Sequence, residues 1–161
     1  MKNKLDQSFF DKDALTLARD LLGCALVHES EAGRTAGVVV ETEAYHQSDE
    51  ASHSYRGKTK HTGIMFGPAG HAYVYFTYGM HWCFNVVADE AGVGAAVLIR
   101  ALEPVEGIEL MKRRRGRTQV KDLCSGPSKL VQAMGIQKEH YGKPLFDDEV
   151  YFLPRSNKKI E

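Results

Sequence analysis

The feature that most constrains the fold is a run of β-forming residues over 71–78, followed closely by a second run over 82–88. Aromatic and β-branched side chains dominate the first run, and such residues fit a pleated strand. Two neighbouring runs of this kind predict a β-hairpin. Its tip then carries Tyr78 and Met80, and its returning arm carries Asn85.

Three further segments read as strands. Residues 95–102 form a nearly continuous apolar run, which is typical of a strand in the middle of a sheet. Residues 24–30 and 35–45 are predicted to pair as a second hairpin. Arg100 is the one charge in the apolar run, and an arginine in a buried strand needs an acidic or phosphate partner. Arg100 is therefore either half of a structural ion pair or a site residue.

Three segments are predicted to be helical. Asp11 can cap a helix that stops at Gly23, and a second helix is expected from Glu103-Pro104 through about Arg114. The third begins at Pro127, which suits the first helical position, and its exposed amides can hold a phosphate. Strands and helices are thus mixed in an α+β chain, and 161 residues suit one domain over 1–161.

Composition narrows the class of protein. No stretch approaches about eighteen uninterrupted apolar residues and the start leads into acidic residues, so we expect a cytosolic protein without a membrane segment. The three cysteines are far apart, which predicts reduced, buried thiols. The 21 basic and 21 acidic side chains balance, so net charge neither demands nor excludes a polyanionic partner. The basic runs 56–61 and 112–117 are each typical of a solvated surface.

The strand over 38–46, with the polar tail that follows it to His53, concentrates the unusual chemistry. Alternation along a strand puts Glu43 and Tyr45 on one face and a set of small residues on the other. The small face, which we expect to pack, consists of Val38, Val40, Thr42 and Ala44. The acidic face is either solvated or a site, and the long polar connection over 46–63 beside it favours a site.

Common catalytic signatures are missing from the chain: there is no G-x-S-x-G, no phosphate-binding Walker loop, no G-x-G-x-x-G and no H-E-x-x-H. What remains is a carboxylate near a histidine, aromatic residues on two strands, an arginine and two basic runs. Aromatic rings that enclose a planar group, with basic residues for a backbone, suit an enzyme that acts on a nucleobase drawn out of its stack. The carboxylate would then activate water.

Seven segments, in order along the chain, resemble motifs of the alkyladenine (3-methyladenine) DNA glycosylase family, and the resemblance covers about residues 8–153. They are residues 40–45, 49–53, 65–68, 73–80, 85–87, 98–104 and 124–130. The resemblance implies a monofunctional DNA glycosylase that removes alkylated or deaminated purines, of the 3-methyladenine and hypoxanthine type, from duplex DNA by base flipping in base excision repair. It implies no metal or cofactor, a monomer located wherever the DNA is, in the nucleoid or nucleus, and a curved antiparallel sheet flanked by helices with a protruding β-hairpin.

The resemblance also assigns roles around the reacting bond. Glu43 matches the family's general base, and Arg100 matches the arginine near the catalytic water and the backbone of the flipped nucleotide. Tyr45, His53 and Tyr75 match the side chains that hold the flipped base.

Other matched residues concern selectivity and DNA contact. Asn85 matches the asparagine on the pocket floor that disfavours the guanine amino group. Tyr78 matches the residue wedged into the minor groove, and Met80, Ser128 and Lys129 are expected to contact DNA. The chain ends at Glu161, where the family usually continues with a further segment, and it lacks an arginine-asparagine pair near residues 60–62. We expect these two departures to affect DNA affinity and stability more than the chemistry.

Two other functions fit the same residues. A divalent-metal hydrolase could take its ligands from Glu43, His46, Asp49, Glu50 and His53. A noncatalytic module that binds damaged DNA would keep the aromatic residues and basic runs without needing Glu43.

Overall fold

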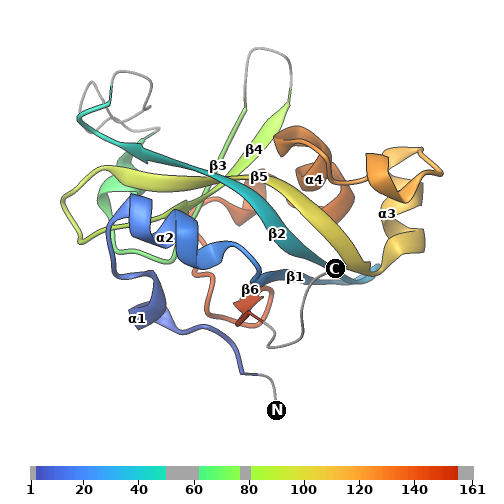
Figure 1. Cartoon of the computed structure of the whole chain (residues 1–161), viewed down its shortest axis with the longest axis horizontal. Coiled ribbons are helices and arrows are strands. Elements are labelled where there is room, and N and C mark those ends of the chain that lie inside the picture. The colour runs from blue at the N-terminus through green and yellow to red at the C-terminus, as the bar shows by residue number, and fades with distance from the viewer. Residues whose placement is uncertain (1–2, 50–61, 77–80, 156–161) are drawn as a thin grey trace.

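Two long central strands organise the fold of the computed structural model, which describes residues 3–49, 62–76 and 81–155. β2 (Gly33–His46) pairs with β5 (Ala95–Glu106) along most of its length, and both cross the whole molecule (Figure 1). Four shorter strands complete one sheet of order β3-β4-β5-β2-β1-β6, in which every pair is antiparallel. These are β1 (Ala25–Ser30), β3 (Ala72–Phe76), β4 (Trp82–Val87) and β6 (Val150–Leu153).

The helices pack on one face of this sheet. They are α1 (Gln7–Phe10), α2 (Ala14–Leu21), α3 (Ile108–Arg115) and α4 (Pro127–Met134), with short 3-10 turns η1 (Gly63–Phe66), η2 (Val120–Asp122) and η3 (Lys138–His140). The main core joins Leu17 of α2 and Leu130 of α4 to Val97 and Ile99 of β5. The predicted α+β class is therefore confirmed. Within the described residues, no helix is long and apolar enough to cross a membrane.

The β3–β4 hairpin rises from the sheet beside α4 (Figure 1). The register of the pair runs from Ala72 opposite Val86 to Phe76 opposite Trp82, as the sequence predicted for a hairpin. The tip at 77–80 lies outside the described residues.

The prediction for the packed face of β2 was partly wrong. Thr42 and Ala44 do face the core, but Val39 is buried there and Val40 is 46% exposed. The pairing with β5 shifts register on both sides of Glu41, which marks a β-bulge. An extra residue in one strand reverses the alternation beyond it. Glu43, after the bulge, keeps its predicted face.

The helix expected from Glu103 starts later. β5 continues to Glu106, with Pro104 opposite Gly37, and α3 begins at Ile108. Between them Gly107 has φ 74°, and a Cβ there would lie 2.3 Å from Arg34 O, so the turn requires glycine. Pairing with β2 therefore outweighs the local helical pattern.

The other helix ends follow local rules. Asp13, rather than Asp11, caps α2 by accepting a 2.9 Å hydrogen bond from Thr16 N. α4 begins at Pro127, as predicted, and ends before Gly135, whose φ is 69°. The three cysteines are free and buried, also as predicted.

Candidate active site

The sheet register places the predicted base and the predicted pocket-floor asparagine in one line. Glu43 on β2 lies opposite Leu98 on β5, Leu98 lies opposite Asn85 on β4, and Asn85 lies opposite Tyr73 on β3. Directly opposed residues point to the same face. Because neighbouring strands are about 4.8 Å apart, the backbones of Glu43 and Asn85 are separated by roughly 10 Å. This line lies on the face opposite α2 and α4.

Two tyrosines flank the line. Tyr45 belongs to the adjacent row, opposite Ala96, and Tyr75 belongs to the row on the other side, opposite Cys83. Burial chiefly raises the pKa of Tyr75, and smaller contributions come from Cys83 and from Tyr45. Aromatic rings placed on the two sides of this line suit a planar guest.

Glu43 is held by two partners. The Tyr45 hydroxyl donates a hydrogen bond to Oε1 of Glu43, and Nη1 of Arg100 lies 3.5 Å from the same oxygen. The Glu43 and Arg100 side chains are 45% and 42% exposed, so solvent reaches both. Burial, with the bond to Glu43, raises the pKa of Tyr45 to about 12, so the phenol keeps its proton at neutral pH. Arg100 was expected to be either half of an ion pair or a site residue. It is both, because its ion pair with Glu43 lies within the candidate site.

The floor of the site is apolar and buried. Asn85 is 3% exposed and its Nδ2 donates to Tyr73 O at 3.2 Å, so the asparagine does bond to backbone. Leu98 is buried between Asn85 and Glu43. Sequence reasoning missed Leu98 and assigned no role to Cys83, because neither residue type signals a site. The strand register, once known, identifies both.

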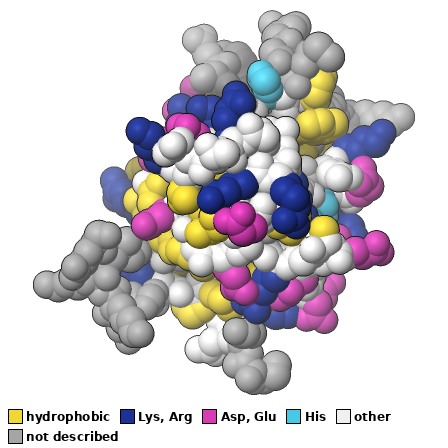
Figure 2. Space-filling model, turned by 90° about the vertical axis from the view of Figure 1, so that its right-hand side faces the viewer, with side chains coloured by type: hydrophobic (Ala, Val, Ile, Leu, Met, Phe, Trp, Pro, Cys, Tyr) yellow, Lys and Arg dark blue, Asp and Glu magenta, His cyan; other side chains and the backbone are white. Residues whose placement is uncertain are grey.

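The expected DNA contacts on α4 line an open groove. Its volume is about 750 Å³, and Ser128 and Lys129 share it with His81, Trp82 and Arg117. His81, which lines the groove, directly follows residues 77–80 in the sequence. Figure 2 looks onto the side that carries α3 and shows Lys and Arg side chains spread over it, with Asp and Glu side chains among them. His53, Tyr78 and Met80 lie outside the described residues.

Two arginines of the basic run 112–117 are not simply solvated. Arg114 donates to Ala133 O and to Ser30 Oγ, each at 3.0 Å. Arg115 donates to Leu123 O, Asp122 O and Gln132 Oε1 at 2.9 to 3.1 Å. These bonds fasten α3 to the last turn of α4, to the segment before α4 and to the end of β1. The solvated-surface prediction was wrong for these two, whereas Arg117 is exposed and lines the groove.

The ligand set of the metal-hydrolase hypothesis does not converge as far as the structure describes it. Nδ1 of His46 lies 2.9 Å from Ser48 Oγ, and Glu50 and His53 fall outside the described residues. Within the described part of the chain, the group with metal-ligand spacing is His28, His140 and Glu149, which that hypothesis did not include.

Comparison with known proteins identifies the family of the chain. The family model described as methylpurine-DNA glycosylase matches residues 8–161. A protein of Carboxydothermus hydrogenoformans, named "Putative 3-methyladenine DNA glycosylase", is 50% identical over 157 residues, covering 98% of this chain and 82% of that protein. A Methanoculleus marisnigri protein of the same name is 55% identical over 143 residues, 89% of this chain and 74% of its own. The family expected from the sequence is confirmed, and the chain belongs to the methylpurine-DNA glycosylase family, a family of DNA glycosylases.

Proposed function

We propose that this protein is a monofunctional glycosylase that hydrolyses the N-glycosidic bond of alkylated or deaminated purines in duplex DNA. The observation that carries the proposal is the line from Glu43 to Asn85, flanked by Tyr45 and Tyr75, in a chain of this family. The substrate class is that of 3-methyladenine and hypoxanthine, and the step belongs to base excision repair.

Glu43 acts as the general base. Its carboxylate takes a proton from water, the water oxygen bonds to C1′ of the sugar, and the bond from C1′ to the purine nitrogen breaks. Positive charge that develops on the sugar is stabilised by the same carboxylate. Tyr45 and Arg100 fix the orientation of Oε1.

The flipped base occupies the space over Leu98. Tyr45 and Tyr75, with His53, enclose its faces, and stacking of this kind offsets part of the free energy needed to unstack the base. Asn85 lies against the edge where guanine carries an amino group that adenine and hypoxanthine lack. A buried asparagine there disfavours guanine.

The DNA lies across the hairpin tip and the groove beside it. Tyr78 fills the gap left by the flipped base, with Met80 next to it. Ser128, Lys129 and Arg117, which line the groove, bind backbone phosphates. The protein works as a monomer, in the nucleoid or nucleus.

A base-release assay tests the proposal. The full chain is incubated with duplex DNA that contains hypoxanthine or 3-methyladenine, with and without EDTA, and free base is quantified by chromatography. We expect release that EDTA does not reduce. Binding of lesion DNA without release would instead establish the noncatalytic module, and release abolished by EDTA would establish the metal hydrolase.

A further inference from the structure

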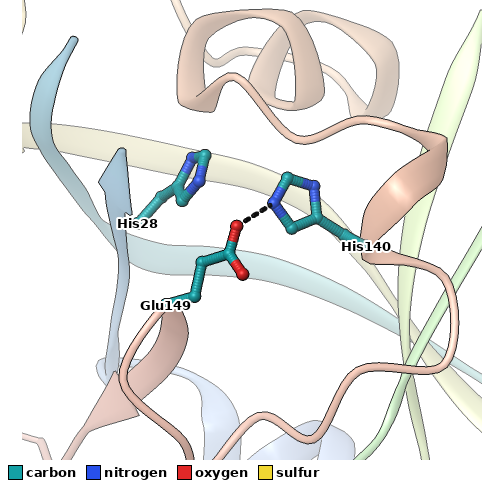
Figure 3. Close-up of side chains that lie close together, drawn as sticks. All are labelled: His28, His140 and Glu149. Carbon is teal, nitrogen blue, oxygen red and sulfur yellow. Dashed lines mark hydrogen bonds and ion pairs between the residues drawn. The ribbon is translucent and has the colours of Figure 1, made fainter. Parts of the chain in front are cut away.

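Two histidines and a glutamate from distant parts of the sequence converge below α4. His28 lies on β1, His140 ends η3, and Glu149 immediately precedes β6. Figure 3 shows the three side chains pointing toward one another. One ligand atom from each, two ring nitrogens and a carboxylate oxygen, lie within 4.8 Å of one another. Both histidines are buried, whereas Glu149 is partly exposed.

The backbone holds these three residues in place. His28 is opposite Val150 in the pairing of β1 with β6, and Glu29 N donates to Glu149 O at 2.8 Å. His140 is fixed by a 2.9 Å hydrogen bond from Gln137 N to its Nδ1. The cluster is therefore organised by the fold itself.

His28 has the tautomer of a metal ligand. Its Nδ1 lies 2.5 Å from Met134 O, and a carbonyl oxygen can only accept, so Nδ1 carries the hydrogen. The lone pair is then on Nε2. A histidine that ligates a metal through one nitrogen usually donates the other N–H to a carbonyl or carboxylate, as here.

His140 and Glu149 already share a proton. Nε2 of His140 is 3.0 Å from Oε2 of Glu149, and Lys143 Nζ is 2.8 Å from the other carboxylate oxygen. The carboxylate is thus ionised and bound to a cation in the described structure. Lys143 is half-exposed, so its ammonium can move into solvent.

We propose that His28, His140 and Glu149 form a site for a divalent transition metal of the Zn²⁺ class, which ties β1, η3 and β6 together. Imidazole and carboxylate are ligands that Zn²⁺ accepts, and water would complete four-coordination. Tetrahedral Zn²⁺ needs ligand atoms about 3.4 Å apart, so the most distant atoms must approach by roughly 1.4 Å. Nε2 of His140 and Oε2 of Glu149 are already 3.0 Å apart, so the approach is between His28 and these two ligands.

Binding of the metal exchanges one tautomer of His140 for the other. The hydrogen leaves Nε2, which becomes a ligand, and Nδ1 gains a hydrogen that Gln137 O, 3.3 Å away, accepts. The bond from Gln137 N is given up, and no net proton is released. This loss limits the affinity of the site.

The site is structural and separate from the candidate active site. His28 lies opposite Thr35 on β2, which precedes Glu43 by eight residues. At about 3.3 Å per residue, the two positions are roughly 26 Å apart along the strand.

Zinc titration of the full chain tests the proposal. We expect Zn²⁺ at about one hundred times its Kd to raise the Tm by roughly 5 to 10 °C, reversibly with EDTA, and Co²⁺ to give visible bands of a four-coordinate site. Glu149→Gln and His28→Gln should weaken Zn²⁺ binding at least about tenfold. Lys143→Gln should strengthen it, because a competing cation is removed.

His46→Gln is the matched control, since it removes an exposed histidine outside the cluster and should leave the Zn²⁺ response unchanged. Glu149→Gln keeps the shape of a partly exposed side chain, so the test does not depend on a destabilised variant. Absence of a Zn²⁺-dependent Tm shift in the wild type would overturn the site. So would a response that survives in Glu149→Gln and His28→Gln or is lost in His46→Gln.

Discussion

At the scale of single residues, the chemistry depends on how the Glu43 carboxylate is held. Tyr45 comes from the same strand two residues on, and Arg100 comes from the neighbouring strand, yet both address the same oxygen. Among the described residues, both contacts are made to Oε1. In the proposed mechanism, Oε1 is oriented by these contacts and the second oxygen takes the proton from water.

Tyr45→Phe should slow single-turnover base release about ten- to hundredfold, since a hydrogen bond to a charged group contributes about 1.5–3 kcal/mol. Binding of lesion DNA should change little, because the ring remains. Tyr73→Phe is the control: that ring is buried beside Tyr75 on β3, and strands β4 and β5 separate it from Glu43 on β2. Equal release rates for Tyr45→Phe and the wild type would show that the hydroxyl does not orient the base.

Asn85→Ala should raise release of guanine-type bases relative to hypoxanthine, by roughly ten- to hundredfold in the ratio. Removing the amide opens the minor-groove edge of the pocket. Because Asn85 also bonds Tyr73 O, total activity and stability should fall, so the measurement is the ratio of single-turnover rates on the two substrates. An unchanged ratio would mean that Asn85 serves only its backbone bond.

At the scale of elements, all three arginines Arg114, Arg115 and Arg117 line the groove, but Arg114 and Arg115 also hold the fold through hydrogen bonds, whereas Arg117 is exposed. Arg115→Ala should lower the free energy of unfolding by about 2–3 kcal/mol, because three hydrogen bonds to α4 and the segment before it are lost. Equilibrium unfolding in denaturant measures the change in the free energy of unfolding.

Arg117→Ala is the counterpart from the same run. Stability should stay within about 0.5 kcal/mol of the wild type, since the side chain is exposed. DNA affinity should fall for every sequence alike, and the slope of log K against log salt should decrease by about 1. A salt slope equal to that of the wild type would remove Arg117 from the DNA surface.

The cap of α2 gives an acid-sensitive element. Hydrogen bonds from Thr16 hold the pKa of Asp13 below its usual range, so its stabilising effect is present above the unfolded pKa and disappears as pH falls through the lower, folded pKa. An asparagine at this position can also cap the helix, but its side chain does not titrate. Below about pH 4, the Tm of the wild type should therefore fall more steeply than that of Asp13→Asn in calorimetry. Parallel curves down to about pH 2.5 would contradict this assignment.

At the scale of the whole molecule, local patterns predicted what local interactions decide. The two hairpins, the start of α4 at Pro127 and the shared face of Glu43 and Tyr45 depend on alternation and turn residues within one segment. The strand order and the line from Glu43 to Asn85 depend on pairing between segments far apart in sequence, and no single run encodes it.

The wrong or missing predictions have the same origin, because they depend on contacts between segments far apart in sequence. β5 extends through Pro104 because β2 is long enough to pair with it, and the bulge near Glu41 follows from fitting two curved strands together. His28 and Glu149 are neighbours only because β1 pairs with β6, so sequence spacing gave no metal-ligand pattern. Arg114 and Arg115 looked solvated because their carbonyl partners carry no sequence signal.

The most direct test of the central claim is Glu43→Gln, measured for single-turnover base release and for binding to the same lesion duplex. The amide keeps the shape of the side chain but cannot take a proton from water. We predict release at least about a hundredfold slower than the wild type, with binding affinity within about threefold. Release at a rate near the wild type, with binding intact, would contradict the account, because the base would then be another residue.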